Sequence, residues 1–216
     1  MPTSNVFYRR NLPHCHLNEY PLFITFRLAD SIPSNVLAKL KTQRENELKA
    51  LRTSDLVKLE KLDQKYFHLY DEWLDRCEMG PQWLRDHRIA QIVMKEIYEL
   101  NSWHYNLMAC CIMPNHVHLL IEWFHIKRDQ HVGRSAKYPV TDTLRLLKGR
   151  TARFCNLELS RSGKFWQHES YDHIVRSDEE LSRTVLYILN NPVKAGLVKN
   201  WRDWEYTYIN PELGEW

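Results

Sequence analysis

Two histidines separated by one residue, His116 and His118, are the side chains of this sequence best suited to hold a metal ion. They follow a turn signal at 114–115 and precede the apolar run 119–121, a pattern typical of a β-strand. Successive side chains of a strand point to opposite faces, so both imidazoles are expected on one face. The spacing predicts a site for one divalent cation, with two structural histidines as the alternative.

A tyrosine and an asparagine four residues apart, Tyr187 and Asn191, are placed to complete such a site. Four residues span about one helical turn, so a helix would present the phenol and the amide on one face. If that face looks onto the two histidines, the set suits cleavage of a phosphodiester by attack of the phenolic oxygen on phosphorus. An ordinary phenol has a pKa of about 10, so the tyrosine needs a nearby metal or base.

The composition is that of a folded protein. The chain has 216 residues and a net charge of +3. Its contents of hydrophobic residues (44%) and aromatic residues (12%) are too high for a disordered chain. This charge is too small to indicate a nucleic-acid partner by itself. Five cysteines without a CxxC pair indicate reduced thiols, and no apolar segment is long enough for a membrane span. We therefore expect a cytoplasmic protein.

The elements that position the candidate residues follow from periodicity and turn signals. A strand at 20–28 precedes two charged helices at 34–52 and 54–73, which we interpret as an inserted hairpin that packs or dimerises and carries no catalytic cluster. The elements expected next are a helix at 82–100, strands at 103–113 and 116–123, a helix at 140–158, a strand at 173–176 and a helix from 177 to 191, ended by Pro192.

This order predicts an α+β fold, a ferredoxin-like sandwich in which an antiparallel sheet carries helices on one face. We expect a single domain over residues 1–216, with the helical hairpin inserted at about 34–78. The histidine strand and the tyrosine helix lie far apart in the sequence, so only the fold can bring them together.

Basic residues concentrate between positions 143 and 164, where Glu158 is the single acidic residue. Such a local cluster predicts contact with phosphates, and a tryptophan directly after it could stack on a base. A solvated helix face and a core tryptophan are the alternatives. The predicted DNA-binding residues are Arg145, Lys148, Arg150, Arg153, Lys164 and Trp166.

Four segments, taken together and in order, resemble one known family. They are 113–118 (MPNHVH), 163–167 (GKFWQ), 171–176 (YDHIVR) and 187–198 (YILNNPVKAGLV). This combination resembles the REP-associated tyrosine transposases, which belong to the single-tyrosine HUH transposase superfamily. The resemblance covers residues 20–30 and about 81–208 and leaves out the helical hairpin.

The resemblance implies a nuclease and strand transferase that binds hairpins of single-stranded DNA and uses magnesium or manganese. In such enzymes tyrosine attack leaves a 5′-phosphotyrosine on the protein and a free 3′-hydroxyl. By this resemblance His116 and His118 are metal ligands, Asn191 is the third ligand and Tyr187 is the nucleophile.

Several alternatives stay open from the sequence. Asn190 competes with Asn191 for the third ligand, where related transposases often carry glutamine, and Tyr171 competes with Tyr187 as nucleophile. A protein that binds hairpin DNA without cutting it is one competing function, and a structural zinc protein that uses the histidines with nearby cysteines is another. The chain is expected to act as a monomer or a homodimer, with the tyrosine helix over its own histidines or over those of a second copy.

Overall fold

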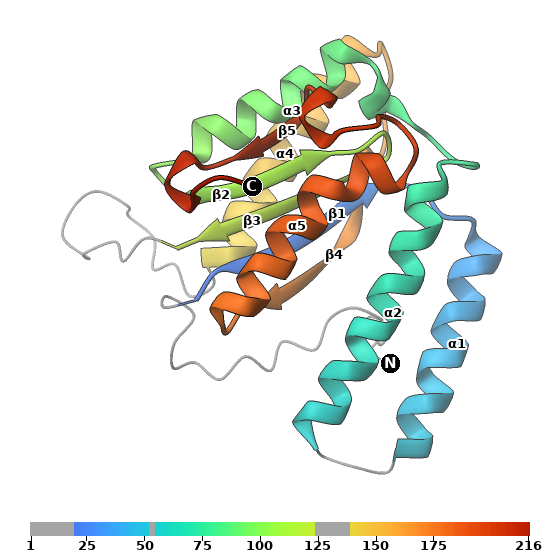
Figure 1. The fold of residues 1–216 in the computed structure, drawn as a ribbon. Coiled ribbons are helices and arrows are strands. Elements are labelled where there is room, and N and C mark those ends of the chain that lie inside the picture. Colours follow the sequence, from blue (N-terminus) through green and yellow to red (C-terminus); the bar gives the residue numbers. More distant parts are fainter. Residues whose placement is uncertain (1–19, 52–54, 124–138) are drawn as a thin grey trace.

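The fold is built on a five-stranded antiparallel sheet with the strand order β4-β1-β3-β2-β5 (Figure 1). The computed structural model describes residues 20–51, 55–123 and 139–216. None of the helices in these ranges is long and apolar enough to cross a membrane. The strands are β1 (Leu22–Leu28), β2 (Asn106–Ile112), β3 (His116–Glu122), β4 (Trp166–Ile174) and β5 (Thr207–Ile209).

Two helices, α3 (His87–Leu100) and α4 (Pro139–Glu158), cover one face of this sheet. They pack on the alternate side chains of β1 and β3 that face them, among which Ile24, Phe26 and Leu119 are fully buried. With β1 to β4 these helices form the strand–helix–strand–strand–helix–strand order of the predicted ferredoxin-like sandwich. The α+β fold with an antiparallel sheet is therefore confirmed.

The opposite face of the sheet is covered by helix α5 (Asp178–Lys194), which lies in front of the strands in Figure 1. Its residues Val185 and Ile188 belong to a second apolar cluster with Phe23 and Leu120 of the sheet. The prediction of helices on one face was correct for α3 and α4 and wrong for α5. The physical reason is that β1 and β3 are buried on both faces, and Phe23 and Leu120 give the second face an apolar patch on which α5 packs.

Helix α5 continues through Pro192 to Lys194, so the predicted end at Asn191 was wrong. Proline has no N–H to donate to the carbonyl four residues earlier and its ring crowds that carbonyl, yet the turn around Pro192 stays helical. The turn is closed around it, because the amide of Ala195 donates to the carbonyl of Asn191 at 2.9 Å. The extension places Lys194 on the helix face that carries Asn191.

Other boundaries also differ from those predicted. Helix α3 begins at His87 because Asp86 caps it by accepting from the Arg88 amide, and a short 3-10 turn η1 (Trp83–Arg85) precedes it. Strand β4 is longer than predicted, and β5 was not predicted. Two further 3-10 turns are η2 (Trp201–Asp203) and η3 (Pro211–Leu213).

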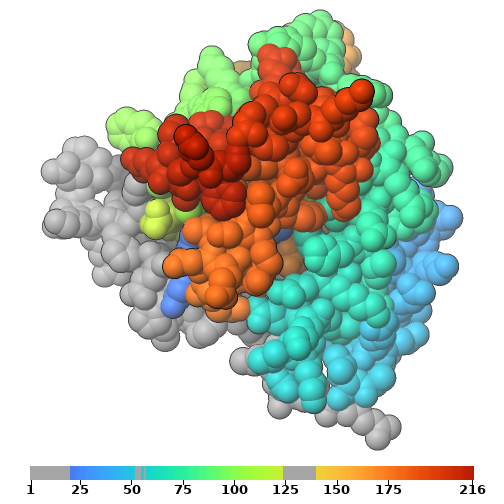
Figure 2. All heavy atoms as spheres, viewed as in Figure 1, coloured from blue at the N-terminus to red at the C-terminus, as the bar shows by residue number. Residues whose placement is uncertain are grey.

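The inserted hairpin consists of α1 (Ser34–Leu51) and α2 (Leu56–Arg76). It has a small apolar core of its own, in which Leu40, Tyr66 and Leu74 are buried. Figure 2 shows α2 and α5 side by side on the surface of the molecule. Because α2 is the helix nearer the sheet, its inner face meets the face of the sheet that carries His116 and His118.

Gly80 lies where the chain returns from the inserted hairpin to the rest of the domain, next to Asp30 at the start of the hairpin. Its φ of +78° is one that L side chains rarely adopt, and an added Cβ would lie 2.4 Å from the carbonyl oxygen of Asp30. We expect Gly80→Ala to lower the free energy of unfolding by about 2–4 kcal/mol, because backbone strain and a steric clash add.

A matched control is Gly163→Ala, where φ is +94° and nothing lies within 4 Å of the added Cβ. This control carries only the conformational cost of about 1–2 kcal/mol. Urea denaturation of both variants measures the difference. Equal losses of unfolding free energy in the two variants would contradict close packing of Gly80 against Asp30.

Candidate functional site

The imidazoles of His116 and His118 lie side by side on the α5-facing side of β3. Their Nε2 atoms are 3.0 Å apart, their ring planes are inclined at 80°, and both side chains are fully buried. The alternation of a β-strand accounts for this placement, as predicted from the spacing of the two histidines.

The other ring nitrogens are held by neighbouring polar groups. Nδ1 of His116 is 2.7 Å from Oδ1 of Asn115, and Nδ1 of His118 is 2.8 Å from Oγ1 of Thr25. The side-chain nitrogen of Asn115 donates to the Leu74 carbonyl at 2.9 Å, which fixes its oxygen as the acceptor for His116. His116 therefore carries its proton on Nδ1 and presents a lone pair on Nε2, whereas the Thr25 hydroxyl can donate to or accept from Nδ1 of His118. With His118 in the same tautomer, two Nε2 lone pairs would face each other across 3.0 Å, an arrangement that a cation between them would satisfy.

Burial also favours neutral imidazoles. It lowers the pKa of His118 to about 3 and that of His116 well below its usual value, with the neighbouring His118 and Lys194 adding to the effect on His116. A neutral imidazole is the form that binds a metal ion. The pair is therefore in the protonation state that a metal site requires.

Asp71 of α2 reaches the same place from the inserted hairpin. Its Oδ1 lies 3.5 Å from Nε2 of His118 and 3.8 Å from Nε2 of His116, and its Oδ2 accepts a hydrogen bond from the Tyr187 hydroxyl. The side chain of Asp71 is fully buried. Asp71, His116 and His118 together form a group whose ligand atoms are close enough to hold a metal ion.

Helix α5 contributes the two residues that the four-residue spacing had singled out. The ring of Tyr187 is 5.4 Å from that of His118, measured between centroids, and the side-chain nitrogen of Asn191 is 3.1 Å from His118 Nε2. Oδ1 of Asn191 is buried without a hydrogen-bond partner in the described part of the chain. Because the two ends of an amide are nearly indistinguishable, a flip would turn this oxygen towards the histidines.

Lys194 and Asp75 form an ion pair at the edge of the site. The ammonium nitrogen of Lys194 is 2.7 Å from Oδ2 of Asp75 and 4.0 Å from Oδ2 of Asp71. Burial raises the pKa of each aspartate to about 6, and the Asp71 carboxylate adds to the effect on Asp75. Burial and the nearby Asp71 also raise the pKa of Tyr187, so the phenol is a neutral hydrogen-bond donor in this arrangement.

The hairpin was expected to carry no catalytic cluster, yet two acidic residues of α2, Asp71 and Asp75, lie within 4 Å of the histidines. The sequence did contain a signal. Asp71 stands four residues after Phe67 and three before Leu74, so an acidic residue interrupts the buried stripe of an amphipathic helix.

Tyr171 and Asn190, the alternatives for the nucleophile and the third ligand, have surroundings that differ from those of Tyr187 and Asn191. Tyr171 of β4 stacks on Phe67 at 4.0 Å between ring centroids, and burial raises its pKa. Asn190 is exposed, whereas Asn191 is buried at the histidines. The group that could hold a metal ion contains no cysteine among the described residues.

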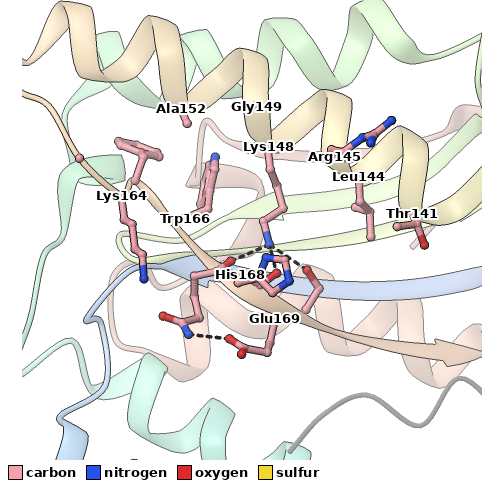
Figure 3. Close-up of a pocket in the computed structure, with 14 residues that line it drawn as sticks. Thr141, Leu144, Arg145, Lys148, Gly149, Ala152, Lys164, Trp166, His168 and Glu169 are labelled. Carbon is pink, nitrogen blue, oxygen red and sulfur yellow. Dashed lines mark hydrogen bonds between the residues drawn. The ribbon is translucent and has the colours of Figure 1, made fainter. Parts of the chain in front are cut away.

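Three of the six predicted DNA contacts already have partners within the fold. Lys148 donates to the carbonyls of Gln167 and His168 and to the Ser170 hydroxyl, as Figure 3 shows. The indole of Trp166 is buried, and its nitrogen donates to Thr151 at 2.8 Å. The third residue is Arg150, which pairs with Glu96 at 3.0 Å and Glu99 at 3.4 Å.

The other three predicted contacts, Arg145, Arg153 and Lys164, are exposed. Arg145 and Lys164 line a pocket of about 580 Å³ between α4 and β4 (Figure 3). This surface lies on the face of the sheet opposite the histidines. The sequence pattern located the basic segment correctly but could not tell which of its side chains were already paired within the fold.

Comparisons with known proteins place the chain among transposases. A Haemophilus influenzae protein named as a REP-associated tyrosine transposase is 31% identical over 122 residues, 55% of this chain and 68% of that protein. The REP-associated tyrosine transposase of Escherichia coli K12 is 27% identical over 127 residues, 59% of this chain and 64% of that protein. The chain thus spans about two thirds of the length of these curated relatives.

No family model matches the chain. Among solved structures, that of a REP-associated tyrosine transposase bound to a REP hairpin aligns with a TM-score of 0.49 at 17% identity. This alignment covers 95% of the chain and 82% of the other protein.

Proposed function

The chain belongs to the family of REP-associated tyrosine transposases, and we propose that it is a metal-dependent endonuclease and strand transferase for single-stranded DNA. One observation carries this proposal. The Tyr187 hydroxyl donates to a carboxylate whose second oxygen lies 3.5 Å from the nearer of two paired imidazoles. The proposed nucleophile and the candidate metal ligands therefore converge within one chain.

The proposed reaction exchanges one phosphate ester for another. The Tyr187 oxygen attacks phosphorus and loses its proton, the bond from phosphorus to the 3′ oxygen breaks, and the departing 3′ oxygen takes up a proton. The product is a 5′-phosphotyrosine and a free 3′-hydroxyl. In strand transfer a 3′-hydroxyl attacks this phosphotyrosine, which restores the phosphodiester and returns the phenol without an external energy source.

We propose that His116, His118 and Asn191 hold Mg²⁺ or Mn²⁺. The Nε2 atoms of the two neutral imidazoles face each other at 3.0 Å, and a flip of the Asn191 amide would turn its buried, unpartnered oxygen towards them; a divalent cation would satisfy this donor set. When bound, such a cation neutralises charge on a non-bridging oxygen of the scissile phosphate. The protein contributes the fixed ring orientations, through Asn115 and Thr25.

The proposed substrate is single-stranded DNA that contains a hairpin, and the exposed Arg145, Arg153 and Lys164 are its proposed phosphate contacts. Replacing Arg145 or Lys164 by alanine is expected to weaken binding several-fold. Each lost contact should also reduce the slope of log affinity against log salt by about 0.7–0.9.

Fluorescence anisotropy with a labelled hairpin oligonucleotide at several salt concentrations measures both effects. Lys39→Ala, an exposed site on α1, is the matched control and should change neither quantity. Equal effects at Lys39 and Arg145 would contradict a DNA surface on α4.

The activity itself is tested by incubating the protein with hairpin-containing single-stranded DNA and Mn²⁺. The proposal predicts a covalent protein–DNA adduct that resists denaturing electrophoresis and is absent when EDTA replaces the metal. Tight binding without an adduct would contradict cleavage.

A second candidate function is recognition of hairpin DNA without cutting. The burial of the site favours it, since the side chains of His116, His118 and Asp71 are fully buried and a phosphate can reach them only if α2 or α5 moves. The same assay separates the two functions, because a binding protein would give a shifted complex and no covalent adduct.

A further inference from the structure

We propose that Asp71, supplied by the inserted hairpin, is a further residue of the active site that binds the divalent cation through Oδ1 and positions the Tyr187 phenol through Oδ2. This inference rests on the proposed function and deepens it. It assigns a chemical role to a hairpin whose sequence had indicated only packing.

Oδ1 of Asp71 lies in an environment that gives it no hydrogen-bond partner among the described residues. This atom is buried and makes no hydrogen bond of good geometry among the described residues, although an unpaired buried carboxylate oxygen is costly. It faces Nε2 of His118 and Nε2 of His116, and the latter carries a lone pair because the His116 proton lies on Nδ1, which donates to Asn115. Lys194 lies 4.0 Å from the other oxygen, Oδ2, and the Asn191 side-chain nitrogen contacts His118, so Oδ1 is the atom of this group that a divalent cation would neutralise.

The two oxygens of the Asp71 carboxylate make different contacts. Oδ2 accepts the hydrogen bond of the Tyr187 hydroxyl, while Oδ1 points to the histidines. One side chain therefore fixes the distance between the nucleophile and the metal-ligating group. Holding a nucleophile in place in this way can contribute strongly to a rate.

Helix α2 is anchored to the turn before β3 and to strand β4. Asn115, whose oxygen accepts from His116, also donates to the carbonyl of Leu74 in the next turn after Asp71. Phe67, one turn before Asp71, stacks on Tyr171 of β4. These contacts, one on each side of Asp71 along α2, fix its position at the site. A loosely packed arm would not fix it.

The test compares Asp71→Asn with Asp63→Asn. Asparagine keeps the size of aspartate and an acceptor for the phenol but removes the charge. Asp63 lies on the same helix, is paired with Arg44 on the surface and serves as the matched control. Mn²⁺ binding is measured on the full-length protein without DNA, by electron paramagnetic resonance of the free ion.

We expect Asp71→Asn to weaken Mn²⁺ binding by about 10–100-fold and Asp63→Asn to leave it unchanged. Adduct formation by Asp71→Asn should fall as well, and Asp71→Glu should restore part of the Mn²⁺ affinity. Thermal unfolding without metal checks the fold, and there Asp71→Asn should be at least as stable as the parent, since a buried charge is removed.

Unchanged Mn²⁺ affinity in a folded Asp71→Asn protein would overturn the inference. A rise in adduct formation would also overturn it, because Asp71 would then be blocking the nucleophile. The two proposals can fail separately. If the parent protein forms no adduct but loses Mn²⁺ affinity on Asp71→Asn, the ligand role stands without the cleavage function; if it forms the adduct while Mn²⁺ affinity is unchanged, only the inference fails.

Discussion

Tyr187→Phe is expected to abolish the covalent adduct with single-stranded DNA, a loss on the order of 10³-fold or more in cleavage rate. Phenylalanine keeps the ring that lies edge-on to Phe23 at 5.9 Å between centroids. The substitution removes only the hydroxyl and its hydrogen bond to Asp71. Affinity for hairpin DNA should therefore stay at the level of the parent protein, as anisotropy would measure.

Tyr171→Phe is the matched control for this prediction. Its ring stacks on Phe67, and phenylalanine can preserve that stack. Adduct formation should survive in this variant. An adduct that persists in Tyr187→Phe and disappears in Tyr171→Phe would transfer the nucleophile to β4 and contradict the proposed site.

His118→Ala is expected to remove most of the stabilisation that Mn²⁺ gives the folded protein. A metal at 100 times its Kd stabilises a protein by about 2.7 kcal/mol, or roughly 5–11 °C in Tm for a chain of this size. Loss of one ligand should weaken binding by about 100-fold or more, which leaves about 0.4 kcal/mol at the same concentration.

Thermal denaturation with Mn²⁺ and with EDTA measures this difference in each variant. His104→Ala is the control, since His104 lies outside the group that could hold a metal ion. We expect its Tm to rise with Mn²⁺ as in the parent protein. The same rise in His118→Ala would contradict a role for the histidine pair in metal binding.

The parts of the site that depend on local periodicity could be predicted from the sequence. A repeat of two residues places His116 and His118 on one face of a strand, and a spacing of four places Tyr187 and Asn191 on one face of a helix. The ferredoxin-like order of elements followed from the same patterns. These features depend on residues that are close in the chain.

The features that were missed depend on contacts between distant segments. Asp71 meets Tyr187 across 116 positions, and nothing local to α2 indicates which helix it will face. Lys148 and Trp166 belong to a basic and aromatic segment, yet the fold turns the ammonium group onto β4 and the indole into the core. Composition can locate such a cluster but cannot determine which of its groups remain free.

Mass spectrometry of the covalent adduct, after digestion with a protease and a nuclease, identifies the residue that attacks the DNA. The protein is first incubated with hairpin-containing single-stranded DNA and Mn²⁺. We expect a 5′-phosphonucleotide attached to the peptide that contains Tyr187. Attachment to the Tyr171 peptide, or the absence of any modified peptide while the DNA is bound, would contradict this expectation.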